Sequence, residues 1–202
     1  NSNIAFQKWI AAVGIILFIG KLVAWKLTNS DAVFSDAMES IVNVISAFLG
    51  LYSLYLAAKP RDENHPYGHG KVEFVTSAIE GSLISIAGVM IIYEGTNSLI
   101  SGKVLSKLDL GIWIIAATAI VNYIMGYISI QIGKRENSIV LISSGKHLQS
   151  DTITTLGVVL SLVLVYFTKN VWIDSVVALF FGFYIMFIGY KRSEEHTSEL
   201  QS

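Results

Sequence analysis

The sequence predicts an all-α membrane protein, a bundle of six transmembrane helices with both termini in the cytoplasm. Three observations support this fold class. The 202-residue chain is 53% hydrophobic and only 14% charged, whereas soluble domains are about 25% charged. Six apolar stretches reach or approach the roughly 20 residues that a helix needs to cross a bilayer. Lysines and arginines are also distributed unevenly between the connections, as the positive-inside rule describes.

The composition excludes several classes of protein. A net charge of −1 leaves no broad basic face, so we expect no nucleic acid partner. The chain has too few charges to cover a soluble surface, which argues against a cytosolic enzyme and against a disordered protein. The absence of cysteine excludes disulfides and thiolate metal sites. We therefore expect an integral membrane protein whose partner is the lipid bilayer. We expect this protein not to be an enzyme and to hold no prosthetic group.

The predicted spans follow one another closely. The first is too long, and too closely followed by the second, to be a signal peptide. The third contains Glu80 and Glu94, and the fifth contains His147 and Asp151, so these two spans should face the interior of the bundle. Glu80 either relays protons or pairs with a lysine, and we favour the pairing. The six spans are 9–27, 32–56, 75–99, 111–132, 142–167 and 171–189.

The basic residues set the predicted orientation. With the N-terminus inside, eight of them fall on inner segments and four on outer loops, and Lys21 lies within the first span and is not counted. This distribution places both termini and the polar loop 58–72 in the cytoplasm. The inner set is Lys8, Lys59, Arg61, Lys71, Lys134, Arg135, Lys146 and Lys191, and the outer set is Lys26, Lys103, Lys107 and Lys169.

The last segment, 192–202 (RSEEHTSELQS), is abruptly polar. It resembles the peptide encoded by a common sequencing-library adapter. We therefore expect residues 1–191 to form the six-helix domain and residues 192–202 to be a non-native tail. An ordinary polar tail is the alternative. In either case no site is assigned to the tail.

Two pairs of polar residues lie within the predicted spans. Glu39 and Asn43 in the second span, like His147 and Asp151 in the fifth, are four residues apart, so each pair lies on one helix face. If the two faces oppose each other, two carboxylates, an amide and an imidazole converge. Their charge of −2 with neutral histidine balances a divalent cation. Such ligands suit zinc, or manganese and iron(II) where oxygen predominates. Spacing alone also allows helix–helix hydrogen bonds without an ion.

A second group of candidate ligands lies in the loop after the second span. Asp62, His65 and His69 occur within eight residues, and Gly68 and Gly70 permit tight turns around them. Two histidines and a carboxylate can bind zinc, with water in the remaining position. A solvated loop whose histidines bind nothing is the alternative.

Three segments together resemble the cation diffusion facilitator family of metal/proton antiporters. They are SDAMESIVN in the second span, HPYGHGKVE after it and HLQSD in the fifth span, and the resemblance covers essentially residues 9–191. It implies a six-helix transmembrane domain, a homodimer and a C-terminal cytoplasmic domain, which we expect to be missing from this chain. By position, the family's transport site matches Glu39, Asn43, His147 and Asp151, and a further zinc site of some members matches Asp62, His65 and His69.

The resemblance also implies a function. A divalent metal efflux transporter would export cytosolic metal in exchange for protons, and the family suggests the bacterial plasma membrane. Zinc is the first expected cargo. Iron and manganese are alternatives, because Glu39 and Asn43 stand where familiar zinc members of the family carry His or Asp followed by Asp. A non-transporting membrane scaffold or metal sensor, which uses the polar residues as inter-helix contacts, is the competing hypothesis. Short loops argue against a third class, a proton-coupled carrier of organic substrates.

Overall fold

The structure, a computed structural model, describes residues 2–57 and 70–199, and these two ranges contain six α-helices and no strand. Each helix contains an apolar stretch long enough to cross a membrane. The predicted all-α, six-span fold is therefore confirmed. The helices are α1 (Ser2–Thr28), α2 (Asp31–Ala57), α3 (Gly70–Ser101), α4 (Leu108–Arg135), α5 (Ile139–Thr168) and α6 (Trp172–Glu199).

The helices extend beyond the predicted apolar spans. Once a helix exists, each added residue gains a backbone hydrogen bond, so polar residues at the membrane surface continue it. Lys134 and Arg135 form the last turn of α4 in this way, where positive charge also suits the helix dipole. Helix α6 runs on to Glu199 and so includes most of the segment 192–202. That this segment is non-native stays a prediction.

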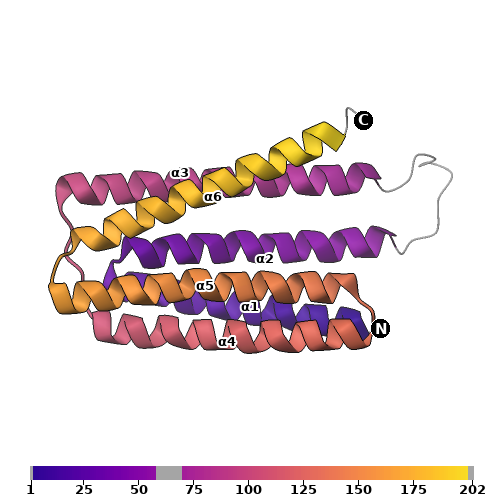
Figure 1. The fold of residues 1–202 in the computed structure, drawn as a ribbon, viewed down its shortest axis with the longest axis horizontal. Helices are drawn as coiled ribbons and strands as arrows, with labels where there is room; N and C mark the ends of the chain where they lie inside the picture. Colours follow the sequence, from indigo (N-terminus) through magenta and orange to yellow (C-terminus); the bar gives the residue numbers. More distant parts are fainter. Residues whose placement is uncertain (1, 58–69, 200–202) are drawn as a thin grey trace.

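The six helices form two groups, as Figure 1 shows. Helices α1, α2, α4 and α5 pack together, while α3 and α6 pack mainly on each other, with α6 crossing α3 obliquely. Helix α2 contacts both groups. A polar side chain on α2 is therefore placed to meet partners from several elements.

Glycine allows the closest of these helix contacts. A Cβ at Gly145 of α5 would lie 2.7 Å from the carbonyl oxygen of Gly126 on α4, and one at Gly126 would lie 2.9 Å from the Gly145 carbonyl. No side chain fits at these distances, so the two backbones touch directly. Membrane helices commonly associate through small residues in this way, because lipid offers no hydrophobic drive for association.

The two ends of the bundle differ. Both described chain ends, and the ends of α2 and α3 that flank residues 58–69, lie at one end, here called the terminal end (Figure 1). At the opposite end, residues 29 and 30 alone join α1 to α2, and Asn29 turns the chain with a positive φ of 60°. Asparagine tolerates this left-handed conformation better than most residues.

The opposite end is also held by a buried cluster, the Asp31–Asp174 cluster. Asp174 at the start of α6 accepts hydrogen bonds from Ser30 Oγ (2.5 Å) and from the Asp31 backbone amide (2.6 Å). Asp31 in turn accepts from Ser175 Oγ at 2.9 Å and forms an ion pair with Lys103 from the α3–α4 connection. Asp174 therefore satisfies amides at the start of α2, where a helix leaves its first donors unpaired.

Apolar side chains fill the interior and also cover the outside. One buried cluster lies between α2, α3 and α6, and another between α1, α2, α4 and α5. Large side chains such as Trp113, Phe167 and Phe180 are mostly exposed. So much exposed apolar surface is unusual for a soluble monomer, and it suits contact with lipid.

Candidate functional site

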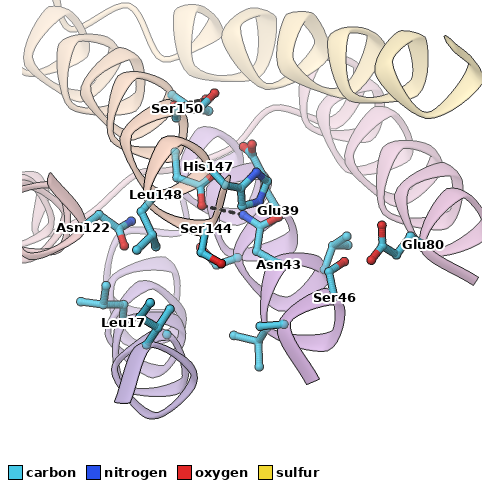
Figure 2. A pocket seen from close by; sticks show the side chains of 18 of the residues that line it. Leu17, Glu39, Asn43, Ser46, Glu80, Asn122, Ser144, His147, Leu148 and Ser150 are labelled. Atoms are coloured by element: carbon cyan, nitrogen blue, oxygen red, sulfur yellow. Dashed lines mark hydrogen bonds between the residues drawn. The ribbon is translucent and has the colours of Figure 1, made fainter. Parts of the chain in front are cut away.

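A cavity of about 740 Å³ lies inside the bundle and is lined by side chains from all six helices. Glu39 and Asn43 reach it from α2, and His147 and Asp151 reach it from α5. Figure 2 shows His147 from α5 close to Glu39 and Asn43 from α2 at this cavity. The structure thus brings together the four residues that the sequence singles out in these spans.

The spacing of each pair explains why both members reach the cavity. Residues four apart on an α-helix stack on one face, and α2 and α5 turn these faces toward each other. The Asn43 side-chain amide donates a 2.7 Å hydrogen bond to Asp151 Oδ2. This bond joins the two helices at the level of the site.

Asp151 is buried with an incomplete set of hydrogen bonds. Its side chain is only 7% exposed, and its second oxygen, Oδ1, has no hydrogen-bond partner among the described residues. A buried acceptor without a partner costs about 1–3 kcal/mol. The arrangement therefore has the capacity to accept a proton or a cation at this oxygen.

The four side chains do not form a finished coordination shell. In the described part of the chain, no group of three or more His, Asp or Glu side chains is arranged to hold a metal ion. Glu39 and Asp151 are near enough for their charges to act on each other, and His147 acts likewise on Asp151. A cation at this site would need small side-chain movements to gather its ligands.

The cavity extends from these residues toward the terminal end. Its wall there includes Gln7 near the start of α1, Ser144 near the start of α5 and Ile188 late in α6. Gln7 donates a 3.1 Å hydrogen bond to Ser144 across this region. Glu80 of α3 also lines the cavity, and Figure 2 shows it beside Ser46 of α2. The sequence marked Glu80 as unusual but did not place it on this wall.

The sequence reasoning missed a buried charged group beside the cavity. Lys21, set aside in the charge count, is 1% exposed and forms an ion pair with Asp36 of α2 at 3.1 Å. A signal for it existed, because an ionisable residue inside a membrane helix is a functional candidate. Its partner could not be read from the sequence, since the two residues lie on different helices.

The second predicted group of ligands, Asp62, His65 and His69, lies outside the described residues. The proposed loop site therefore stays a prediction.

Comparison with known proteins gives a family. The model of the cation efflux transmembrane domain matches residues 8–201. An uncharacterized transporter of Synechocystis sp. is 38% identical over 180 residues, which cover 89% of this chain and 58% of that protein. The manganese efflux system protein MneS of Bacillus subtilis is 26% identical over 86% of this chain and 60% of its own length.

The cation-efflux pump FieF of Pectobacterium carotovorum is 25% identical over 94% of this chain and 63% of its own length. The chain thus spans about three fifths of the length of these relatives. The family match covers nearly the whole chain and agrees with the resemblance carried by the motifs of the second and fifth spans. This chain belongs to the cation efflux family of membrane transporters.

Proposed function

We propose that this chain forms the pathway of a divalent metal efflux transporter that exchanges metal for protons. The observation that most supports this function is the cavity shared by Glu39, Asn43, His147 and Asp151, in which Asp151 Oδ1 is buried without a described partner. A divalent cation would supply that partner and would neutralise the two carboxylates together.

The route for the metal begins at the terminal end. The lysine and arginine distribution predicts that this end lies in the cytoplasm, and the cavity extends from the site toward it. Glu80, half-buried on the wall, adds a carboxylate between the terminal end and the site. Negative charge in a cleft with low-dielectric walls concentrates cations, so cytosolic metal would be attracted before it is bound.

Proton exchange follows from the chemistry of the ligands. Carboxylates and imidazole must be deprotonated to bind metal, so metal uptake releases protons and protons displace metal. The donors proposed here are of both kinds, the imidazole of His147 and the carboxylates of Glu39 and Asp151. Metal and protons would then bias the inward- and outward-facing states through their different affinities for the two.

Zinc is the cargo first expected from the family, and manganese is the second candidate. Three of the four proposed donors are oxygens, and an oxygen-rich set favours manganese or iron(II). One relative is named as a manganese efflux protein. Since Asn43 is a poor zinc ligand, a direct comparison of the two metals is the decisive measurement.

The family resemblance also supports proposals about the loop after α2, the oligomeric state and the membrane. Asp62, His65 and His69 would bind metal at the cytoplasmic mouth, two chains would form a homodimer, and the assembly would lie in a bacterial plasma membrane. Replacing His65 and His69 with alanine tests the first of these. Unchanged metal stoichiometry and unchanged flux would leave the loop with a structural role only.

The test of the transport site is equilibrium binding of zinc and manganese to the detergent-purified chain, measured by calorimetry. Glu39→Gln/Asp151→Asn should lose one metal equivalent, because both changes keep the side-chain shape and remove the charge. Asp109→Asn/Glu136→Gln is the matched control, since it removes two exposed carboxylates from α4 and its C-cap. Binding that survives in the first variant would contradict the site.

Transport itself separates the efflux function from the scaffold or sensor. In proteoliposomes with a proton gradient, the parent chain should move the metal it binds, and Asp151→Ala should abolish the flux. Near-normal flux in Asp151→Ala would reject the assigned site. Binding without any flux in the parent would favour a sensor.

A further inference from the structure

Lys21 lies deep in the bundle with all of its hydrogen-bonding capacity used. Its ammonium group donates to Asp36 Oδ1 at 3.1 Å, to Ser40 Oγ at 2.8 Å and to Thr155 Oγ1 at 3.3 Å. Thr155 in turn donates to Asp36 at 3.0 Å. An ammonium group has three donors, and here each meets an oxygen from α2 or α5.

This group lies one helical turn from the candidate transport site. Asp36 precedes Glu39 by three residues on α2, and Thr155 follows Asp151 by four residues on α5, so the layer is about 5.4 Å away along the helices. It lies on the side away from the terminal end, because α2 starts and α5 finishes at the opposite end.

The charges of this layer reach the transport site. Lys21 and Asp36 each act electrostatically on both Glu39 and Asp151. The two charges oppose each other, so together they leave the site nearly as it would be without them. Losing one partner of a buried pair leaves the other charge uncompensated, and that charge would then act on any cation bound one turn away.

We propose that Lys21 and Asp36 form an internal charge pair that sets the affinity of the transport site for divalent metal. Lys21 opposes cation binding and Asp36 favours it. The balance holds the affinity between the two extremes that either charge alone would give, and the lysine lies on the side through which an exported metal would leave. This inference rests on the proposed function, because it assumes that the cavity binds the cargo. Neither residue is a metal ligand in it.

A purely structural role predicts a different response to mutation. If the pair only joins α1, α2 and α5, removing either partner should weaken metal binding, because both changes loosen the same three helices. An electrostatic role predicts opposite effects from the two single variants. The sign of each change in affinity therefore separates the two explanations.

The experiment is calorimetric titration of manganese and zinc into the full chain in detergent. Lys21→Met should bind metal at least tenfold more tightly than the parent, and Asp36→Asn at least tenfold more weakly. The double variant Lys21→Met/Asp36→Asn should lie within threefold of the parent. Thr155→Val, which removes hydrogen bonds and no charge, should also lie within threefold. Single variants that both weaken binding, or that both leave it unchanged, would overturn the proposal.

Two further comparisons keep the test decisive. If Lys21→Met fails to fold, Asp36→Asn is compared with the neutral double variant, from which it differs by one lysine charge. It should bind at least tenfold more weakly, and equal affinities would overturn the proposal. Glu39→Gln/Asp151→Asn is titrated in parallel. Metal binding retained by this variant would reject the transport site itself. If this variant loses binding while the Lys21 and Asp36 variants all bind metal with the affinity of the parent, only the role of Lys21 and Asp36 is rejected.

Discussion

At the scale of single residues, the candidate site depends on how Asp151 is held. Asn43 donates to one of its oxygens and leaves the other without a described partner. A carboxylate fixed in this way would need no large rearrangement to bind the cation that we propose there. Sequence spacing identified these residues, because i, i+4 pairs of polar groups stand out in apolar spans.

The sequence could not supply the partners of these residues. Lys21 and Asp36 are fifteen positions apart and meet only because α1 and α2 pack side by side. Thr155 joins them from more than a hundred residues further on. Contacts of this kind depend on the packing of whole helices, and no local pattern encodes them.

His147 carries the residue-scale prediction on metal choice. His147→Asp would replace the one nitrogen donor with an oxygen donor, and oxygen ligands favour manganese over zinc. The ratio of zinc to manganese affinity should therefore fall at least tenfold, measured by competitive titration of the purified chain. An unchanged ratio would count against direct coordination by His147. Ser150→Asp, on the cavity wall of the same helix, controls for added charge alone.

At the scale of elements, the six spans follow from hydropathy and the pairing of helices does not. Apolar stretches of sufficient length predict helices because a bilayer requires every backbone group to be paired internally. Which helices touch depends on the fine shape of their surfaces. Gly88, Gly126 and Gly157 each have a neighbouring helix within contact distance. Gly81 differs, because a Cβ there would meet no described atom of a neighbouring helix within 4 Å.

This contrast predicts the effect of adding one methyl group. Gly145→Ala would bring a Cβ within 2.6 Å of Ile130 and 2.7 Å of the Gly126 carbonyl. Overpacking of this kind costs about 1–3 kcal/mol, so the melting temperature in detergent should fall. Gly81→Ala is the matched control and should leave it unchanged or raise it slightly, because alanine favours the helix. Equal melting temperatures for both variants would show that α4 and α5 do not touch at glycine.

Asp174 joins two elements at the opposite end. It lies in the first turn of α6, where the dipole of its own helix favours a negative charge. The structure shows that it also accepts from Ser30 and from backbone amides at the start of α2. The sequence could not predict that role, because it does not show that α6 begins beside α2.

Asp174→Asn tests this link between α2 and α6. The amide would turn one donor toward groups that are themselves donors, so at least one buried hydrogen bond should be lost, at a cost of about 1–3 kcal/mol. The thermal stability should fall clearly below that of Asp109→Asn, which changes an exposed residue of α4. A melting temperature equal to that control would mean that the Asp31–Asp174 cluster contributes nothing to stability.

At the scale of the whole molecule, the two ends of the bundle are built differently. The opposite end is held by the Asp31–Asp174 cluster and by a hydrogen bond from the Ser106 amide to the Thr28 carbonyl. The cavity reaches instead toward the terminal end. Under the proposed function, this asymmetry would be that of a transporter facing the side from which it takes its cargo. The distribution of lysine and arginine predicts the same direction, with the terminal end in the cytoplasm.

Orientation and access can be measured together, because the chain has no cysteine of its own. Ser143→Cys would place a thiol on the cavity wall near the terminal end. A membrane-impermeant thiol reagent should label it in inside-out vesicles and not in right-side-out vesicles. Ser101→Cys, exposed at the finish of α3, should show the reverse pattern. If both patterns are exchanged, the orientation is inverted. If Ser143→Cys is labelled from both sides, the cavity is not closed at the Asp31–Asp174 cluster, and that cluster cannot be what keeps metal from passing outward.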